Sequence, residues 1–187
     1  MTSKLALVRH GQTDWNLEGR LQGRTDIPLN DTGRAQARAL GKSLRGAGWD
    51  VVLASPLGRA QETATLIAAE LGAQTGAAVP ELTERAFGPM EGLIMAEVSE
   101  AEAAKMLSEL ETREAILIRA LPALLSLSQQ HAGRNLMVVS HGATMRNVRD
   151  ALAGHKITRG VENGEVIEID LGRLDQLVAG LNILQES

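Results

Sequence analysis

Short apolar runs alternate along the chain with longer stretches in which apolar residues recur at helical spacing. The apolar runs predict buried β-strands over residues 5–8, 51–54 and 136–139. The helical spacing predicts helices over about 31–45, 55–71 and 142–153, and mainly helical structure over 96–130. Strands that alternate with helices are typical of a mostly parallel central sheet covered on both faces. The sequence therefore predicts an α/β protein with three layers, α/β/α.

Particular residues mark the helix ends. Asn30 or Asp31 is expected to cap the first helix, whose buried face would hold Ala35, Ala39, Leu40 and Leu44. Ser55 and Pro56 are typical of a helix start, with serine at the N-cap and proline at the first helical position. Pro122 is expected to kink or break its helical stretch.

The C-terminal tail predicts two further strands, over 165–170 and 177–183, joined by a turn around Gly172. The 187 residues show no internal repeat, low-complexity tract or linker. That length suits one domain with a sizeable core, so a single domain over residues 1–187 is expected.

Composition narrows the function classes. A net charge of −4 gives no support to nucleic-acid binding, and three aromatic residues offer little surface for stacking bases. The absence of cysteine excludes disulfide scaffolds, thiolate zinc sites and cysteine nucleophiles. The first apolar run is too short for a signal-peptide core or a membrane span. A cytoplasmic protein with no nucleic-acid or membrane partner is therefore expected.

Three of the predicted helix and strand junctions carry related chemistry. The first strand ends in Arg9-His10-Gly11, the second is followed by Ser55 and Arg59, and the strand at 136–139 ends in His141-Gly142. Ligands bind at the carboxyl ends of strands in open α/β sheets, so two imidazoles and two guanidiniums should converge at one sheet edge. Glycine after each histidine permits a tight turn and close approach of a ligand. Together with helix N-termini, these groups suit a phosphoryl group.

The plainer interpretation is that each histidine is merely a hydrogen-bonded residue at a strand end. It explains one His-Gly pair well. It explains poorly two pairs that each follow an apolar strand-like run.

The chain resembles the histidine phosphatase superfamily, the phosphoglycerate-mutase-like proteins, in five segments that occur in the family's order. The first is Arg9-His10-Gly11-Gln12-Thr13-Asp14-Trp15-Asn16, and the others span residues 23–37, 55–64, 82–92 and 139–142. A lone Arg-His-Gly is weak evidence, whereas the ordered set is specific and covers the chain up to about residue 150. The residues at 111–119 also resemble a helix of the phosphatase branch.

The resemblance implies that His10 is the nucleophile and forms a phosphohistidine. Arg9 and Arg59 would bind the equatorial phosphate oxygens, where the guanidinium fork suits two oxygens at once. His141 would donate a hydrogen bond to the phosphoryl group as charge develops on it. Asn16, and Gly142 through its backbone, match phosphate-contacting positions. Thr13 either contacts phosphate or stabilises the loop, and Gln22 is a weaker candidate for substrate binding.

Glu84 matches the family's general acid, which protonates the leaving oxygen and then activates water. Its neighbours Glu81 and Glu91 are rivals, although both are more simply explained as solvated or structural residues. The four histidines show no metal-ligand spacing, and the arginines stand where other phosphatases use metal. No metal and no cofactor are expected.

The expected activity is that of a metal-independent, histidine acid-type phosphatase acting on small phosphorylated metabolites, with a small-molecule phosphomonoester as partner. Two alternatives stay open: a small phosphoglycerate mutase, and a non-catalytic module that binds a phosphorylated ligand. A mutase must retain a bisphosphorylated intermediate and needs extra cations, but residues 93–114 hold only Lys105 and Arg113. Met90, Leu93 and the helices around residues 96–118 are expected to cap the site and to set substrate preference. The substrate is left open, as is a homodimer.

Overall fold

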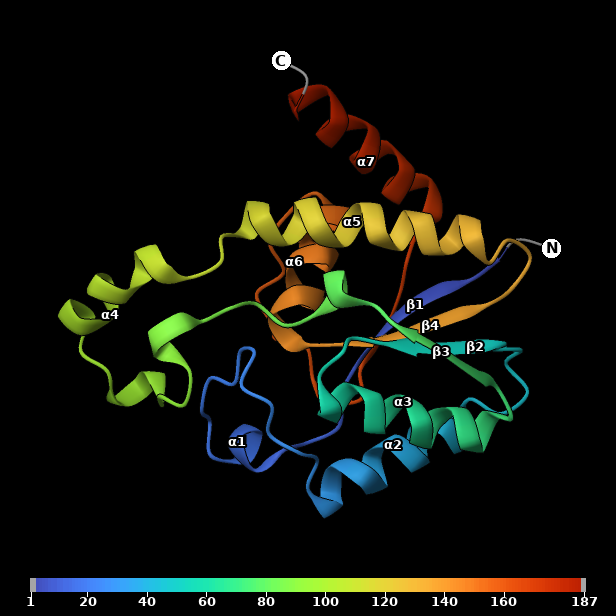
Figure 1. Ribbon diagram of the computed structural model, residues 1–187, viewed down its shortest axis with the longest axis horizontal. Coiled ribbons are helices and arrows are strands. Elements are labelled where there is room, and N and C mark those ends of the chain that lie inside the picture. The colour runs from blue at the N-terminus through green and yellow to red at the C-terminus, as the bar shows by residue number, and fades with distance from the viewer. Residues whose placement is uncertain (1–2, 186–187) are drawn as a thin grey trace.

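A five-stranded sheet forms the centre of the computed structural model, which describes residues 3–185 (Figure 1). Its strands lie in the order β3-β2-β4-β1-β5. Every neighbouring pair is parallel except β1 and β5, which are antiparallel. The strands are β1 (Leu5–Arg9), β2 (Val51–Ala54), β3 (Gln74–Ala78), β4 (Leu136–Ser140) and β5 (Val166–Glu168). The predicted mostly parallel sheet is confirmed.

Helices cover both faces of this sheet, as predicted. α2 and α3 lie on one face, and α5, α6 and α7 lie on the other (Figure 1). The helices are α1 (Asp14–Leu17), α2 (Asp31–Ser43), α3 (Gly58–Leu71), α4 (Glu100–Met106), α5 (Arg113–Gln130), α6 (Gly142–Ala153) and α7 (Leu171–Gln185). Short 3-10 turns lie at Pro80–Leu82, Gly88–Met90, Met95–Glu97 and Leu107–Glu109.

The central strands are apolar throughout because successive side chains enter different cores. Leu5 and Leu7 of β1 pack on the side of α5, α6 and α7. Ala6 and Val8 of the same strand pack on the side of α2 and α3. Each fully buried leucine or valine contributes roughly 1.5–3 kcal/mol of transfer free energy. Burial on both faces explains why these strands appear as continuous apolar runs rather than as alternating patterns.

The face that α2 buries matches only half of the predicted one, since Leu40 and Leu44 pack against the core as expected. The helix is capped by Asn30, whose side chain accepts from the Gly33 amide. Its buried residues are Gly33, Ala37 and Gly41, whereas Ala35 and Ala39 are exposed. At Gly41 an added Cβ would lie 2.7 Å from the Cβ of Glu70 on α3. The two helices pack so closely that glycine and alanine, rather than leucine, occupy the contact.

α3 begins three residues later than predicted. Its N-cap is Leu57, which makes no side-chain capping bond, and the first helical residue is Gly58. The Gly58 amide instead donates to Oδ2 of Asp26, 2.7 Å away in a distant loop. The Ser55 hydroxyl is engaged with His141. A tertiary contact therefore replaces the local cap that Ser55 was expected to provide.

The structure differs from two expectations for the C-terminal half. α5 continues through Pro122, so of the kink or break expected there, the break does not occur. The carbonyl that loses its helical donor belongs to Ile118, which is 46% exposed, so solvent can satisfy it. Residues 177–183 lie within α7, not in a strand, and Gly172 lies in its first turn. The buried Leu174 and Val178, four residues apart, form the helical stripe facing the core.

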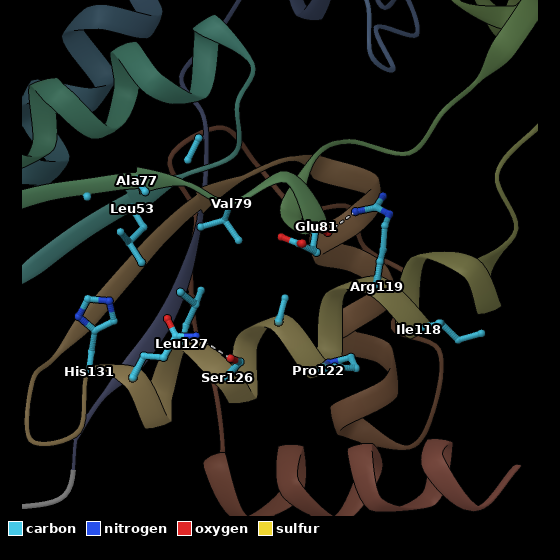
Figure 2. A pocket seen from close by; sticks show the side chains of 14 residues that line it. Leu53, Ala77, Val79, Glu81, Ile118, Arg119, Pro122, Ser126, Leu127 and His131 are labelled. Atoms are coloured by element: carbon cyan, nitrogen blue, oxygen red, sulfur yellow. Dashed lines mark hydrogen bonds between the residues drawn. The ribbon is translucent and has the colours of Figure 1, made fainter. Parts of the chain in front are cut away.

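The strand β3 was not predicted, because Gln74–Ala78 is exposed and has neither a β-branched run nor alternation. It is a strand because it pairs with β2 at the edge of the sheet. A groove of about 770 Å³ lies between β3 and α5 (Figure 2). None of the helices within residues 3–185 is both long and apolar enough to cross a membrane.

Candidate active site

The three motif-bearing strand ends lie side by side, because β2, β4 and β1 are neighbours in the sheet. Arg9 is the last residue of β1, and His10 follows it. Ser55 follows β2, and His141 follows β4. The His10 and His141 rings are 5.1 Å apart between centroids. Parallel strands place these carboxyl ends at one edge, as predicted.

His10 is buried with one defined tautomer. Its Nδ1 lies 2.7 Å from the carbonyl oxygen of Gly11. A carbonyl can only accept, so Nδ1 carries the ring proton. Nε2 therefore carries no proton, and its lone pair accepts a hydrogen bond from Arg59 Nε at 3.3 Å. Burial, followed by the cations Arg59 and Arg9, lowers the pKa of His10 well below its ordinary value of 6.5. The arrangement produces a neutral imidazole with a directed lone pair.

Arg59 is fully buried in the first turn of α3. Nη1 donates to the carbonyl of Thr25 at 2.8 Å, and Nη2 donates to the carbonyl of Gly23 at 2.7 Å. Asp26 lies 3.6 Å from Nη1. Two backbone carbonyls therefore hold the guanidinium in one orientation, and a lysine could not satisfy both and reach His10 as well.

Arg9 supplies a second cation, which is partly buried. Its Nη1 donates to the carbonyl of Val161 at 2.5 Å, whereas its buried Nε has no protein partner among the described residues. Gly142 packs directly on this side chain, since an added Cβ would lie 3.3 Å from Arg9 Nε. Gly11 lies against the Gly33 backbone, where a Cβ would come within 2.4 Å of the carbonyl oxygen. Both glycines thus make room for protein groups, not only for a ligand.

His141 is also fully buried, and it is paired with Ser55. The Ser55 Oγ lies 2.5 Å from His141 Nε2. Nδ1 of His141 is buried and has no partner within residues 3–185. Burial is the largest cause that lowers the pKa of His141 well below 6.5, followed by His10 and Arg59. The ring is therefore neutral, with one nitrogen held and the other available.

Glu84 lies at the N-terminus of α6. Its Oε1 accepts from the Thr144 amide at 3.0 Å and from the Arg85 amide at 2.8 Å. Its Oε2 accepts from the Ala143 amide at 3.1 Å. Free amides at a helix N-terminus bind carboxylates well. These hydrogen bonds hold the Glu84 side chain at the N-terminus of α6, the helix that follows His141.

A partly buried ion pair supports the segment that carries Glu84. Arg119 of α5 donates to both carboxylate oxygens of Glu111, at 2.7 and 3.0 Å. Arg119 also donates to the carbonyls of Thr83 and Glu84, at 3.0 and 3.4 Å. The segment 111–119 that resembled a family helix therefore contacts the backbone that carries Glu84. It is more than a packing helix.

The rival carboxylates have other surroundings. Glu81 is exposed. Glu91 accepts from the amides of Arg24, Thr25 and Phe87 and from the Thr25 hydroxyl, which together clamp two loops. Glu84 alone of the three lines the pocket beside His10.

That pocket has a volume of about 290 Å³. Seven of the predicted site residues line it: Arg9, His10, Asn16, Gln22, Arg59, Glu84 and Gly142. His141 and Thr13, the other two predicted site residues, are fully buried and do not line the pocket. The lining residues that sequence reasoning missed are Arg20, Leu21, Phe87, Ala143, Arg146, Gly160 and Val161. Only Arg146 carried a usable signal, because it lies one helical turn beyond Gly142.

Thr13 acts as the N-cap of α1 in the structure. Its hydroxyl accepts from the Asn16 amide at 3.2 Å, and Asn16 Oδ1 accepts from the Thr13 amide at 3.1 Å. The same hydroxyl lies 2.9 Å from Gln22 Oε1. Of the two roles predicted for Thr13, these contacts favour that of stabilising the loop. Asn16 and Gln22 reach the pocket from this capped loop.

Other expected features are placed differently. Met90 is buried, and neither it nor Leu93 lines the pocket, so the predicted cap by these residues is wrong; Phe87 lies there instead. Within residues 3–185 no three His, Asp or Glu side chains gather as a metal-binding group.

The lowered pKa values of His10 and His141 make stability depend on pH. Below about pH 6.5 these two histidines bind protons in the unfolded chain but stay neutral in the folded protein. The free energy of unfolding should therefore fall as the pH drops through this range. Urea unfolding at about pH 7, 6 and 5, in buffers without phosphate or sulfate, measures this fall. His10→Gln should flatten the dependence. Equal stability at pH 7 and pH 5 would contradict the two buried neutral rings.

The fold and the pocket define the class of protein. It is an α/β protein whose parallel strand ends present imidazoles and guanidiniums to one pocket. Residues 5–183 match the family model of the histidine phosphatase superfamily (branch 1), and the chain belongs to this family.

The relatives of this chain include proteins named as phosphatases and proteins named as phosphoglycerate mutases. An uncharacterized phosphatase, PhoE of Bacillus subtilis, is 35% identical over 150 residues, which cover 80% of this chain and 77% of that protein. A 2,3-bisphosphoglycerate-dependent phosphoglycerate mutase of Gloeobacter violaceus is 38% identical over 160 residues, 77% of this chain and 73% of that protein. A phosphoserine phosphatase mutant of Entamoeba histolytica, solved with phosphoserine, has a TM-score of 0.76 at 28% identity and covers 89% of this chain and 90% of its own.

Proposed function

We propose that the protein is a phosphomonoester hydrolase that works through a phosphohistidine on His10, with arginines rather than a metal ion holding the phosphoryl group. One observation carries the proposal. The Gly11 carbonyl places the proton of His10 on Nδ1, and burial beside Arg59 and Arg9 keeps the ring neutral. A neutral imidazole with its lone pair at a cationic pocket is what attack on phosphorus needs.

In the first step, the Nε2 lone pair of His10 forms a bond to phosphorus while the bond from phosphorus to the ester oxygen breaks. The phosphoryl oxygens take the donor that Arg59 Nε otherwise directs at Nε2. The unpaired Nε of Arg9 offers a further donor. With the Ser55 hydroxyl donating to Nε2 of His141, the His141 proton lies on Nδ1, which also becomes a donor to the phosphoryl group.

Glu84 acts first as the general acid and then as the general base. Protonated, it gives its proton to the departing oxygen, so that an alcohol rather than an alkoxide leaves. As a carboxylate, it then takes a proton from the water that attacks phosphorus. The P–N bond breaks, inorganic phosphate is released, and His10 is again neutral. The amide seat at α6 holds the carboxyl group for both steps.

Hydrolysis and mutase activity share this chemistry and differ in what accepts the phosphoryl group. The short acidic stretch at 93–114 favours hydrolysis. The pocket nevertheless holds Arg20 and Arg146 from other segments, so missing charge is a weaker argument than the sequence suggested. Relatives with phosphatase names support hydrolysis independently.

A phosphate-release assay on a panel of small phosphomonoesters tests the proposal. We expect stoichiometric inorganic phosphate and dephosphorylated alcohol. Phosphate moved to another hydroxyl of a sugar acid without net release would identify a mutase. Tight binding of phosphate esters without release by either route would identify a binding module, and both results would overturn the proposal.

We further propose that two copies of the chain pair through β3. All five residues of this edge strand are exposed, and none is charged or proline, so no side chain of the strand blocks edge-to-edge pairing. The groove beside it is lined largely by apolar and small residues, with Ile118 46% exposed. Figure 2 shows Glu81 and His131 toward opposite ends of this groove.

Charges at the two ends of β3 support an antiparallel pair. Arg134 donates to the Gln74 side chain at the first end, and the exposed Glu81 follows the other end. In a twofold pair centred near Gly76, Arg134 of each copy would face the partner's Glu81.

Analytical ultracentrifugation tests this pairing. We expect a dimer for the wild type and a monomer for Ala77→Lys, because the variant places a lysine from each copy in the groove region near the twofold axis. Ala69→Lys, an exposed change on α3, is the matched control and should stay dimeric. A monomeric wild type, or a dimeric Ala77→Lys, would refute the β3 interface.

A further inference from the structure

A second, basic hollow adjoins the catalytic pocket. It has a volume of about 260 Å³ and is lined by Arg113, Arg146, Asn147, Asp150 and Lys156. Arg146 lines both this hollow and the pocket that holds His10. It lies on α6, four residues beyond Gly142, which is about 6 Å along the helix axis. The two spaces therefore share one arginine as a common wall.

The cations of this hollow are not compensated by the protein. Arg113, Arg146 and Lys156 are exposed. None of the ion pairs found within residues 3–185 involves any of the three. The one carboxylate in the lining, Asp150, already accepts from Arg149 at 3.1 and 3.2 Å. Three like charges thus surround one hollow in a chain whose net charge is −4.

Arg146 is also close enough to other cations to affect them. Burial lowers the pKa of Arg85, and the charge of Arg146 lowers it further. The Arg85 guanidinium lies over the Phe87 ring at 5.3 Å. Phe87 in turn lines the catalytic pocket. Placing Arg85 and Arg146 close together without an ion-pair partner for either among the described residues costs electrostatic free energy, which a bound anion would offset.

We propose that Arg146, with Arg113 and Lys156, binds a second anionic group of the substrate, a carboxylate or a second phosphate carried on a short carbon chain. The proposal rests on the proposed phosphatase function, because it assumes that the first phosphate is held at His10. The spacing along α6 suits a small metabolite. The guanidinium of Arg146 can bind two oxygens of such a group at once.

Three phosphomonoesters of matched length test the proposal. Glycerol 3-phosphate has no second anionic group, 3-phosphoglycerate adds a carboxylate, and propane-1,3-diyl bisphosphate adds a phosphate. We expect the wild-type kcat/KM to be higher for the two doubly anionic esters. Arg146→Gln should lower kcat/KM for those two esters about 10- to 100-fold, the range of a charge-assisted hydrogen bond, with a several-fold smaller loss for glycerol 3-phosphate. Comparison of the two doubly anionic esters shows which group is preferred.

Arg38→Gln is the matched control, because it removes the same charge from an exposed position on α2, across the sheet. It should leave all three rates unchanged. Lys156→Gln should act in the same direction as Arg146→Gln. Equal losses for all three esters, or a wild type that does not distinguish them, would overturn the second anion site.

The same site can be tested if the phosphatase function fails. In that case no ester releases phosphate, and binding of 3-phosphoglycerate and glycerol 3-phosphate is measured by calorimetry. Tighter binding of 3-phosphoglycerate that is lost in Arg146→Gln would support the anion site without hydrolysis. Equal binding of the two esters would overturn it.

Discussion

His10→Ala should reduce phosphate release by at least about 10³-fold, because it removes the atom that accepts the phosphoryl group and no other neutral nucleophile lines the described pocket. The loss should appear with every ester, whatever its leaving group. The second measurement is covalent labelling. Wild-type protein quenched during turnover of a ³²P-labelled ester should carry a base-stable, acid-labile label, and the variant should carry none.

Controls separate this effect from a loss of fold. His155→Ala removes an exposed histidine and should keep full activity. His10→Gln keeps most of the side-chain volume and should be as inactive as His10→Ala. Thermal unfolding of all three variants checks that the sheet is intact. A folded His10→Ala that retains more than a tenth of the rate would mean that phosphoryl transfer does not run through this ring.

Glu84→Gln should produce the second large effect, and one that depends on the leaving group. For alkyl phosphates the expected loss in kcat is about 10²- to 10⁴-fold, because the leaving alkoxide must receive a proton. The loss in the first step should be much smaller for 4-nitrophenyl phosphate, whose nitrophenolate departs without one. Because the variant also lacks a base to activate water, it should release one burst of nitrophenolate per site and then stall.

Glu81→Gln is the matched control, because Glu81 is an exposed neighbour three residues away. Its rates should equal those of the wild type with both kinds of ester. Equal losses for alkyl and nitrophenyl esters in Glu84→Gln would point to a positioning role rather than to proton transfer. The three amides and the Thr144 hydroxyl that surround Glu84 make that distinction necessary.

Much of the fold could be predicted because its signals are local. The runs at 51–54 and 136–139 are short, apolar and rich in valine and leucine, and both are strands buried on two faces. In the C-terminal tail, the strand predicted over 165–170 is found as β5. The strand predicted over 177–183 is wrong, because a short apolar stretch does not separate strand from helix. Leu174 and Val178 bury one stripe of a helix against the core. Their spacing of four residues is that of a helix and not of a strand. β3 has no local signal and depends on pairing with β2.

The candidate site divides in the same way. Local signals indicated His10, Arg59 and His141 as candidates, because a strand end followed by glycine or a helix start can be recognised within a few residues. Glu84 was a candidate only through the family resemblance. The pairing of Ser55 with His141 could not be predicted, because 86 residues separate them and a local helix cap was the simpler role. Arg146 was missed for a related reason, since its place in the pocket depends on how α6 packs beside β1 and β4.

The amino-acid sequence by itself determined the apolar strands, the order of the helices around them and the residue types at the strand ends, because these depend on periodicity and on neighbours in the chain. Only the tertiary structure decided the protonation and the orientation of those residues. His10 is neutral because burial removes water and because the carbonyls of Gly23 and Thr25 hold Arg59 against it. Desolvation and charge act between segments far apart in the sequence, so they exist only once the chain has folded.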